Sequence, residues 1–355
     1  MQMSPNKSAQ WSLQDDLDFI FSSTEEVFLS LKGARIFLTG GTGFIGCWLL
    51  ESLRHADMRL NLDVQVTVLT RDYSAFQLKA PHLAMYPKFK FVVGEVSNFS
   101  SPEGTYTHII HAATDASADL NENNPIGMFN TVVEGTRRVL DFAVEKKPQR
   151  ILYLSSGAVY GQQPWEMERV AEDWIGAPNC LDPRAAYAEG KRAAEMMCAI
   201  YGKQFGLQIS IARIFALLGP YLSLGIHFAA GNFIRDAMQG KPVVVNGNGL
   251  PCRSYLYAAD LTVWLWHLLV RGQLNTAYNV GSDESVSIKQ LAERTSVVLG
   301  TGEFQVLGAN DAGWNLGRYV PDTSLVGREL GLYKTVSLDE SIRRTALWHG
   351  WKGKQ

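Results

Sequence analysis

Apolar residues in the first 33 positions recur at the spacing of an amphipathic helix. They are Leu17, Ile20, Phe21, Val27, Phe28 and Leu31. Ser23 and Thr24, followed by two glutamates, have the composition of a helix start, so we predict that a helix begins there. Residues 1–33 are therefore expected to form a helical extension that packs on the rest of the protein, rather than a binding arm.

From residue 34 short apolar runs alternate with amphipathic stretches. The runs predict strands at 34–38, 64–69, 90–93, 108–111, 151–154 and 208–213, and the amphipathic stretches predict helices at 44–55, 126–144 and 185–201. Alternation of this kind is typical of βαβ units. We predict an α/β fold in which residues 34–218 form a Rossmann-type, doubly wound parallel sheet with helices on both faces.

The pattern is less regular after about residue 219. Short strands at 243–245 and 277–280 are mixed with helices at 233–238, 260–270, 288–299 and 338–348. We therefore expect residues 219–355 to be mostly a smaller α/β substrate lobe, with some segments returning to the main sheet. The cleft between the two parts is the expected active site.

Composition excludes several classes of protein. Hydrophobic residues make up 46% of the 355, and 33 basic residues nearly balance 35 acidic ones. A chain of this kind can build a core, and it has no charge excess to attract nucleic acid or an anionic membrane. The four cysteines are dispersed, which suggests neither a disulfide framework nor a metal site. With no apolar run long enough for a bilayer or a signal peptide, we expect a cytoplasmic protein.

The first predicted strand runs into a glycine-rich turn that opens a helix, and the turn reads Thr39-Gly40-Gly41-Thr42-Gly43-Phe44-Ile45-Gly46. Gly40 permits a tight turn, Gly43 lets the backbone approach a pyrophosphate, and Gly46 lets the helix pack closely. The helix N-terminus adds free N–H groups and partial positive charge. Because this turn opens a βαβ unit, we interpret it as a dinucleotide-binding loop rather than a plain turn.

The end of the second strand carries the residue that reads the adenosine ribose. An acid there accepts a hydrogen bond from the 2′-hydroxyl of NAD, whereas an arginine suits the 2′-phosphate of NADP. Here Thr70 stands at the acid's position and Arg71 follows. We therefore predict NADP as the cofactor, and Asp72 keeps NAD open.

A candidate catalytic group follows the fifth strand. Ser156 stands at the strand end, and Tyr187 and Lys191 share one face of a later helix at i and i+4. A tyrosine is too weakly acidic to act as a base at neutral pH, but a nearby ammonium and an oxidised nicotinamide favour its phenolate. Ser156 can bond the substrate hydroxyl or carbonyl while Tyr187 moves the proton.

Together these residues resemble the extended short-chain dehydrogenase/reductases of the nucleotide-sugar epimerase/dehydratase family. The resemblance runs from about Arg35 to Trp348. It implies a nucleotide-diphosphate sugar as substrate, bound by Asn232, Arg253 and Arg318, and a homodimer is expected. The residues expected to bind the dinucleotide are Gly40, Gly43, Phe44, Ile45, Gly46, Thr70, Arg71, Glu95, Val96, Ala112, Ala113, Tyr187 and Lys191.

Departures from the family pattern narrow the reaction. The 4,6-dehydratases of this family have Asp and Glu after the residue that matches Ser156, and UDP-glucuronate decarboxylases have a Glu at the second of these positions; here Gly157 and Ala158 stand there. The resemblance thus implies hydride transfer at C4 of the sugar, by a 4-epimerase or a 4-ketoreductase. Glu189 and His227 are candidates for a missing acid. A dehydratase, a decarboxylase, and a non-catalytic dinucleotide sensor stay open as alternatives.

Overall fold

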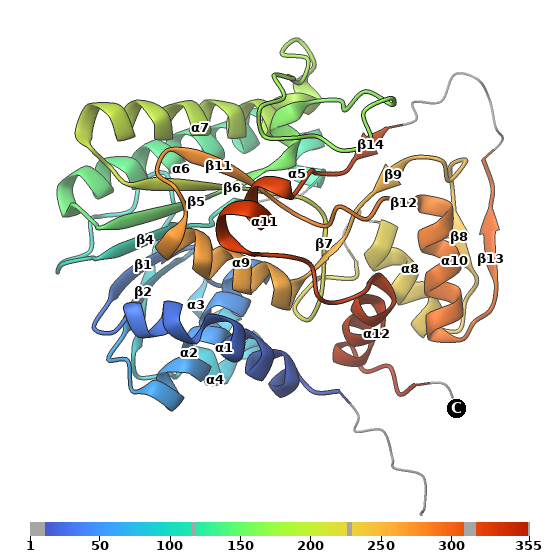
Figure 1. Cartoon of the computed structure of the whole chain (residues 1–355), viewed down its shortest axis with the longest axis horizontal. Helices are drawn as coiled ribbons and strands as arrows, with labels where there is room; N and C mark the ends of the chain where they lie inside the picture. The colour runs from blue at the N-terminus through green and yellow to red at the C-terminus, as the bar shows by residue number, and fades with distance from the viewer. Residues whose placement is uncertain (1–10, 115–117, 226–228, 309–316, 354–355) are drawn as a thin grey trace, which may run out of the picture.

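Seven parallel strands form the central sheet of the computed structural model, which describes residues 11–114, 118–225, 229–308 and 317–353 (Figure 1). In spatial order the strands are β3 (Phe89–Val93), β2 (Gln65–Thr70), β1 (Arg35–Thr39), β4 (His108–His111), β5 (Arg150–Ser156), β6 (Ile209–Ile214) and β11 (Thr276–Val280). The order reverses between β1 and β4, which is the switch point of a Rossmann-type sheet. The predicted fold class is confirmed.

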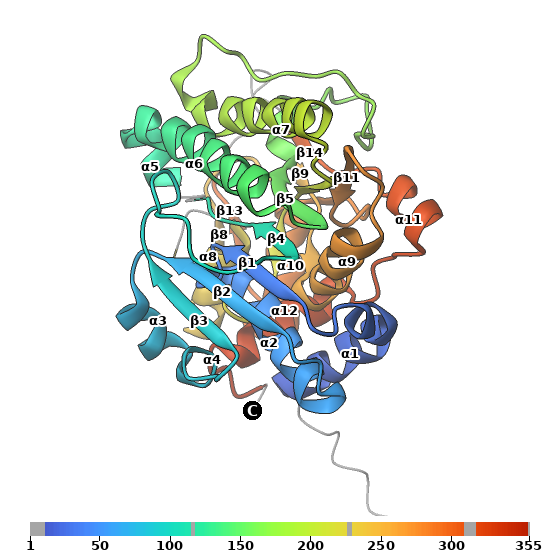
Figure 2. The ribbon, with the colours of Figure 1, turned by 90° about the vertical axis from the view of Figure 1, so that its left-hand side faces the viewer.

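Helices cover both faces of this sheet (Figures 1 and 2). One face carries α1 (Leu13–Ser30), α2 (Phe44–Leu60) and α9 (Ala258–Arg271), with α3 (Tyr73–Lys79), α4 (Pro81–Ala84) and α11 (Ser324–Leu330) nearer its edges. The other face carries α6 (Pro125–Lys146) and α7 (Ala186–Phe205), with the short helices α5 (Ala118–Asn123), η1 (Gly157–Tyr160) and η2 (Pro183–Ala185) close by.

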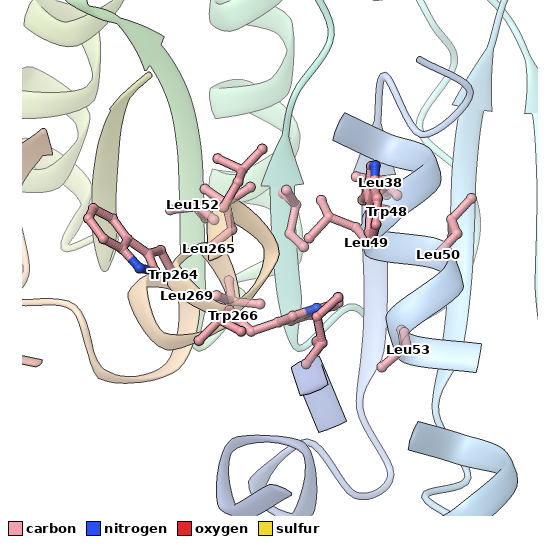
Figure 3. Close-up of a cluster of buried hydrophobic side chains, with 14 of the residues drawn as sticks. Leu38, Trp48, Leu49, Leu50, Leu53, Leu152, Trp264, Leu265, Trp266 and Leu269 are labelled. Carbon is pink, nitrogen blue, oxygen red and sulfur yellow. The ribbon is translucent and has the colours of Figure 1, made fainter. Parts of the chain in front are cut away.

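Alternate residues of each strand enter two separate cores, because successive side chains point to opposite faces of a sheet. On β1, Ile36 and Leu38 pack with α2 and α9, whereas Phe37 packs with α6 and α7. The first core contains the buried indoles of Trp48, Trp264 and Trp266 (Figure 3). Burial on both faces explains why these strands read as continuous apolar runs.

The expected helix start near Ser23 is wrong. A single helix, α1, begins after the N-cap Ser12 and continues through that site. The hydroxyls of Ser22 and Thr24 donate to the carbonyls of Phe19 and Ile20, at 2.9 and 2.5 Å, so both bond within the helix instead of capping a new one.

A smaller set of elements lies beside the carboxyl ends of the sheet, on the right in Figure 1. Its strands form three short sheets: β7 (Leu217–Leu218) with β10 (Leu256–Tyr257), β8 (Val243–Val245) with β13 (Phe304–Val306), and β12 (Val286–Ser287) with β9 (Cys252–Arg253) and β14 (Arg318–Tyr319). Its helices are α8 (Ala229–Met238), α10 (Ile288–Leu299) and α12 (Leu338–Trp348). A third apolar core joins these helices, so this part has packing of its own.

The described part of the chain lacks two kinds of feature. It contains no helix with both the length and the apolar content needed to cross a bilayer. It also contains no group of three or more His, Cys, Asp or Glu side chains arranged to hold a metal ion.

Candidate active site

The glycine loop between β1 and α2 has the geometry that a dinucleotide needs. Gly40 has a φ of +72°, and a Cβ on it would lie 2.6 Å from the carbonyl carbon of Ala112. A Cβ on Gly46 would lie 2.3 Å from the oxygen of Gly40. Gly43 is exposed and caps α2, so the first-turn N–H groups of that helix face an open surface. The loop therefore fits a pyrophosphate held on the helix N-terminus.

The ends of β2 and β3 carry the residues expected at the adenosine. Thr70 is buried, and its Oγ1 accepts a hydrogen bond from the N–H of Asp72 at 3.3 Å. The carboxylate of Asp72 accepts from Ala75 N–H at 2.9 Å and so caps α3. Arg71 and Glu95 are both exposed. The carboxylate of Asp72 is thus engaged in capping α3, which makes it less available to accept a hydrogen bond from a ribose hydroxyl.

On the other side of the loop, β4 ends in His111, Ala112 and Ala113. The His111 ring lies between the hydroxyls of Thr39, at 2.8 Å, and Thr136, at 3.1 Å. Burial lowers the pKa of His111 to about 3, so the imidazole is neutral and serves to fix the strand ends. Val96, which follows β3, is buried, and its side chain packs against Gly135 of α6.

The structure brings Ser156, Tyr187 and Lys191 together at the end of β5 and the start of α7. Ser156 Oγ accepts a hydrogen bond from Ala158 N–H at 3.2 Å and interacts with the Tyr187 hydroxyl. The backbone N–H of Tyr187 donates to Asn121 Oδ1 at 3.0 Å, which fixes the first turn of α7. Two hydroxyls from distant segments thus meet at one edge of the sheet, beside the dinucleotide loop.

Lys191 is buried beside Tyr187 and is anchored by two hydrogen bonds. Its Nζ donates to the Leu154 carbonyl at 2.6 Å and to Thr114 Oγ1 at 2.8 Å, and lies 5.9 Å from the centre of the Tyr187 ring. Burial lowers the pKa of Lys191 to about 7, although Glu195 opposes the change. Burial also raises the pKa of Tyr187, and the hydrogen bond with Ser156 offsets this only in part.

The position after Ser156 has no room for an acid. A Cβ on Gly157 would lie 2.5 Å from the tip of the Phe215 ring, and Phe215 is itself buried. The Phe215 ring packs on Tyr319 with centres 4.5 Å apart, and the Tyr319 hydroxyl lies 3.4 Å from Ser156 Oγ. No role for Tyr319 was predicted from the sequence. The one indication of such a role in the sequence is that Tyr319 follows Arg318, an expected substrate residue.

The candidate acids named from the sequence do not fill this gap. Glu189 forms an ion pair with Arg192 at 3.5 Å, one turn along α7. His227 lies outside the described residues.

Two of the expected substrate residues lie on paired strands. In the register of β9 and β14, Tyr319 is opposite Arg253, and Arg318 is opposite Cys252. Since opposed residues share a face, Arg253 is on the side of Tyr319 and Ser156. Arg253 donates to the carbonyls of Cys252 and Gly317, at 2.8 and 3.0 Å.

Arg318 points to the other face of that small sheet. Its guanidinium carbon lies 4.5 Å from the centre of the Trp165 ring. Its Nε is buried and has no hydrogen-bond partner in the described part of the chain. An unpaired, buried donor of this kind is available to an incoming acceptor.

The third expected substrate residue, Asn232, lies on α8 and borders a cavity of about 480 Å³. Its Oδ1 accepts a hydrogen bond from Arg235 at 3.0 Å. The cavity lining continues through Asn246 and Asn248 to Pro251, two residues before Arg253. The wall is thus rich in amide groups, which can both donate to and accept from a polar ring.

Comparisons with known proteins show the family and the fold of the chain. The model of the "NAD dependent epimerase/dehydratase family" matches residues 36–281. Among curated proteins, UDP-glucuronic acid decarboxylase 1 of Xenopus tropicalis is 31% identical over 322 residues, covering 90% of this chain and 73% of that protein.

Two solved structures share the fold. The UDP-glucose 4-epimerase of Thermotoga maritima, crystallised with UDP-glucose, superposes with a TM-score of 0.74 at 20% identity, covering 89% of this chain and 98% of the other. The dTDP-glucose 4,6-dehydratase of Streptomyces venezuelae, crystallised with NAD, gives 0.75 at 24% identity, covering 89% and 96%. At these identities the two structures support the fold and not a particular reaction.

Proposed function

The chain belongs to the NAD-dependent epimerase/dehydratase family, and on this premise we propose that it transfers hydride at C4 of a nucleotide-linked sugar. The observation that carries the proposal is the meeting of Ser156 and Tyr187 beside the glycine loop. A phenol held beside the hydroxyl that binds the substrate oxygen can take up and return the proton of that oxygen.

Each residue has a distinct part in the proposed reaction. The bound nicotinamide supplies the site that accepts or returns the hydride. Ser156 donates a hydrogen bond to the C4 oxygen and holds it near the phenol. Tyr187 takes the proton from that oxygen during oxidation and returns it during reduction. Lys191 is anchored by Leu154 and Thr114, and its ammonium adds positive charge that favours the Tyr187 phenolate once the site is filled.

The packing at Gly157 favours a 4-epimerase or a 4-ketoreductase over a 4,6-dehydratase. Elimination of water needs an acid and a base near C5 and C6 of the sugar, and the Phe215 ring takes the space that a side chain at position 157 would use. Ala158 has no ionisable group. A UDP-glucuronate decarboxylase is the second candidate, because a curated relative at 31% identity has that name.

We further propose that the sugar nucleotide lies across β9, β14 and α8. Arg253, on the face that it shares with Tyr319, binds its diphosphate, and the cavity beside Asn232 holds its base. Arg318, on the other face, offers its unpaired Nε as a second contact for the phosphate or the ribose. Guanidinium groups suit phosphate because of their planar set of donors.

NADP is the proposed dinucleotide, since Thr70 offers no carboxylate to repel a 2′-phosphate and Asp72 is engaged as a helix cap.

A homodimer is also proposed, with α6 and α7 at its interface. The exposed apolar residues Met196 and Ile200 lie one turn apart on α7, and Ile126 is exposed on α6. Sedimentation velocity of the wild type and of Ile200→Glu tests this. We expect a dimer that the new charge weakens, and a monomeric wild type would contradict it.

Product analysis tests the proposed reaction. The purified protein is incubated with NADP or NAD and with UDP-glucose, UDP-galactose, UDP-glucuronate or dTDP-glucose, and in a separate reaction with NADPH and a 4-keto sugar nucleotide, and the products are analysed by NMR and mass spectrometry. A 4-epimer has unchanged mass, and a ketoreductase converts a 4-keto sugar with NADPH. Loss of carbon dioxide would favour the decarboxylase, and loss of water the dehydratase. Dinucleotide binding without turnover of any sugar would favour a sensor.

A further inference from the structure

Lys79, the last residue of α3, contacts the dinucleotide loop. Its Nζ donates to the carbonyl oxygen of Thr42 at 2.9 Å, and Thr42 stands between Gly41 and Gly43 in the loop. No carboxylate in the described part of the chain forms an ion pair with Lys79. An ammonium has three donors: one goes to Thr42 and a second lies beside the Cys47 thiol, which is a weak acceptor, so a stronger acceptor can compete for the remaining donors.

The groups around Lys79 include one buried carboxylate, which is bonded to other side chains. The ring of Tyr221 lies 5.7 Å from Nζ, measured to the ring centre. The nearby carboxylate of Glu51 is buried, and it already accepts hydrogen bonds from the Tyr221 hydroxyl and from His82 at 2.5 and 2.7 Å. The thiol of Cys47 is buried and stays protonated, since burial raises its pKa to about 11. An anion that reaches the loop therefore meets an ammonium that forms no direct ion pair with the described residues.

The strand order decides which part of a dinucleotide Lys79 faces. β1 lies between β4 and β2, and the loop packs against Ala112 on the β4 side. Helix α3 follows β2 directly, so Lys79 approaches the loop from the β2 side. In a Rossmann site the adenosine ribose is read at the end of β2, while the pyrophosphate sits on the helix N-terminus. Lys79 and Arg71 thus lie toward the same part of the ligand.

We propose that Lys79 determines dinucleotide specificity by binding the 2′-phosphate of NADP together with Arg71. This inference rests on the proposed NADP preference. Asp72 caps α3 and so fixes where this helix begins. The start of the helix in turn determines the position of Lys79 at its end. The neutral carbonyl of Thr42 holds the ammonium in place, and a doubly charged phosphate is a stronger acceptor for its remaining donors.

Titration calorimetry at fixed ionic strength tests the proposal with four probes: NADP, NAD, adenosine 2′,5′-bisphosphate and ADP. Lys79→Gln removes the charge and leaves a polar side chain that is one atom shorter. We expect this change to weaken NADP and adenosine 2′,5′-bisphosphate by about tenfold and to leave NAD and ADP within about twofold. Lys79→Arg retains most of the affinity. The matched control is Lys90→Gln, which removes an exposed charge from β3 and leaves all four constants unchanged.

Other outcomes overturn the proposal. Equal weakening of ADP and NAD by Lys79→Gln would assign Lys79 to the pyrophosphate. Unchanged affinities for all four probes would mean that Lys79 only holds the loop in place through its bond to Thr42. The wild-type constants are a separate test of cofactor choice. A wild type that prefers NAD, with selective loss of the bisphosphate in Lys79→Gln, would reject the NADP preference but keep the Lys79 contact.

Discussion

The hydroxyl of Tyr319 lies 3.4 Å from Oγ of Ser156, although 163 residues separate them in sequence. Tyr319 comes from β14 and Ser156 from the end of β5, so the pair connects the smaller part of the structure to the catalytic edge of the sheet. Phe215 supports the Tyr319 ring and covers Gly157. Burial raises the pKa of Tyr319 above its usual value, so the phenol keeps its proton and acts through hydrogen bonding.

We predict that Tyr319→Phe lowers kcat by about tenfold with little change in KM, because a lost neutral hydrogen bond costs about 0.5–1.5 kcal/mol. The reason is that Ser156 loses one of the groups that orient its hydroxyl. Steady-state kinetics with the true substrate measure this, and the pH profile of kcat should keep its shape. A raised KM at constant kcat would assign Tyr319 to substrate binding instead.

Tyr187→Phe is expected to reduce turnover by about 10²–10⁴, since the phenolic oxygen is the group that moves the proton. The ring packs as before, so the dissociation constant of the dinucleotide should change by no more than a few fold. Single-turnover hydride transfer and a binding titration check the two parts. A variant with near-normal rate would remove Tyr187 from the mechanism.

Arg253→Ala is expected to raise KM for the sugar nucleotide by about 10–100-fold, because a charge-assisted bond to phosphate contributes about 1.5–3 kcal/mol. The KM for the dinucleotide should change far less. Arg253→Lys should recover part of the loss, since it restores the charge without the planar donors. Equal effects on both ligands would indicate that the bonds of Arg253 to Cys252 and Gly317 are structural.

Lys191 gives the protein a pH-dependent stability. Burial lowers its pKa from 10.5 to about 7. Between these values the unfolded chain holds a proton that the folded chain lacks, so the free energy of unfolding rises with pH, by at most about 1.4 kcal/mol per unit. Below the folded-state pKa both states hold the proton and the slope disappears.

Lys191→Met removes this titration and keeps most of the side-chain volume. Urea unfolding of both proteins between about pH 6 and pH 9 measures the effect. We expect the free energy of unfolding of the wild type, relative to the variant, to increase above about pH 7. A constant difference across this range would show that Lys191 keeps an ordinary pKa.

Local sequence determined much of the architecture. The helices Ile288–Leu299 and Leu338–Trp348 have the bounds that their patterns predict, because their periodicity reflects a single buried face. The strand His108–His111 also has its predicted bounds, because burial on both faces gives it a continuous run. The glycine loop was also readable, since only glycine fits at Gly40 and Gly46. The helix start near Ser23 was misread, because serine and threonine can bond within a helix as well as cap one.

Tertiary structure decided the chemistry around these elements. That Tyr319 reaches Ser156, that Phe215 fills the space above Gly157, and that Lys79 returns to Thr42 depend on contacts between segments far apart in the chain. No periodicity records such contacts, because each is set by how strands pair and helices pack rather than by the neighbouring residues. The sequence alone determined which groups could react, and the packing determined which of them meet.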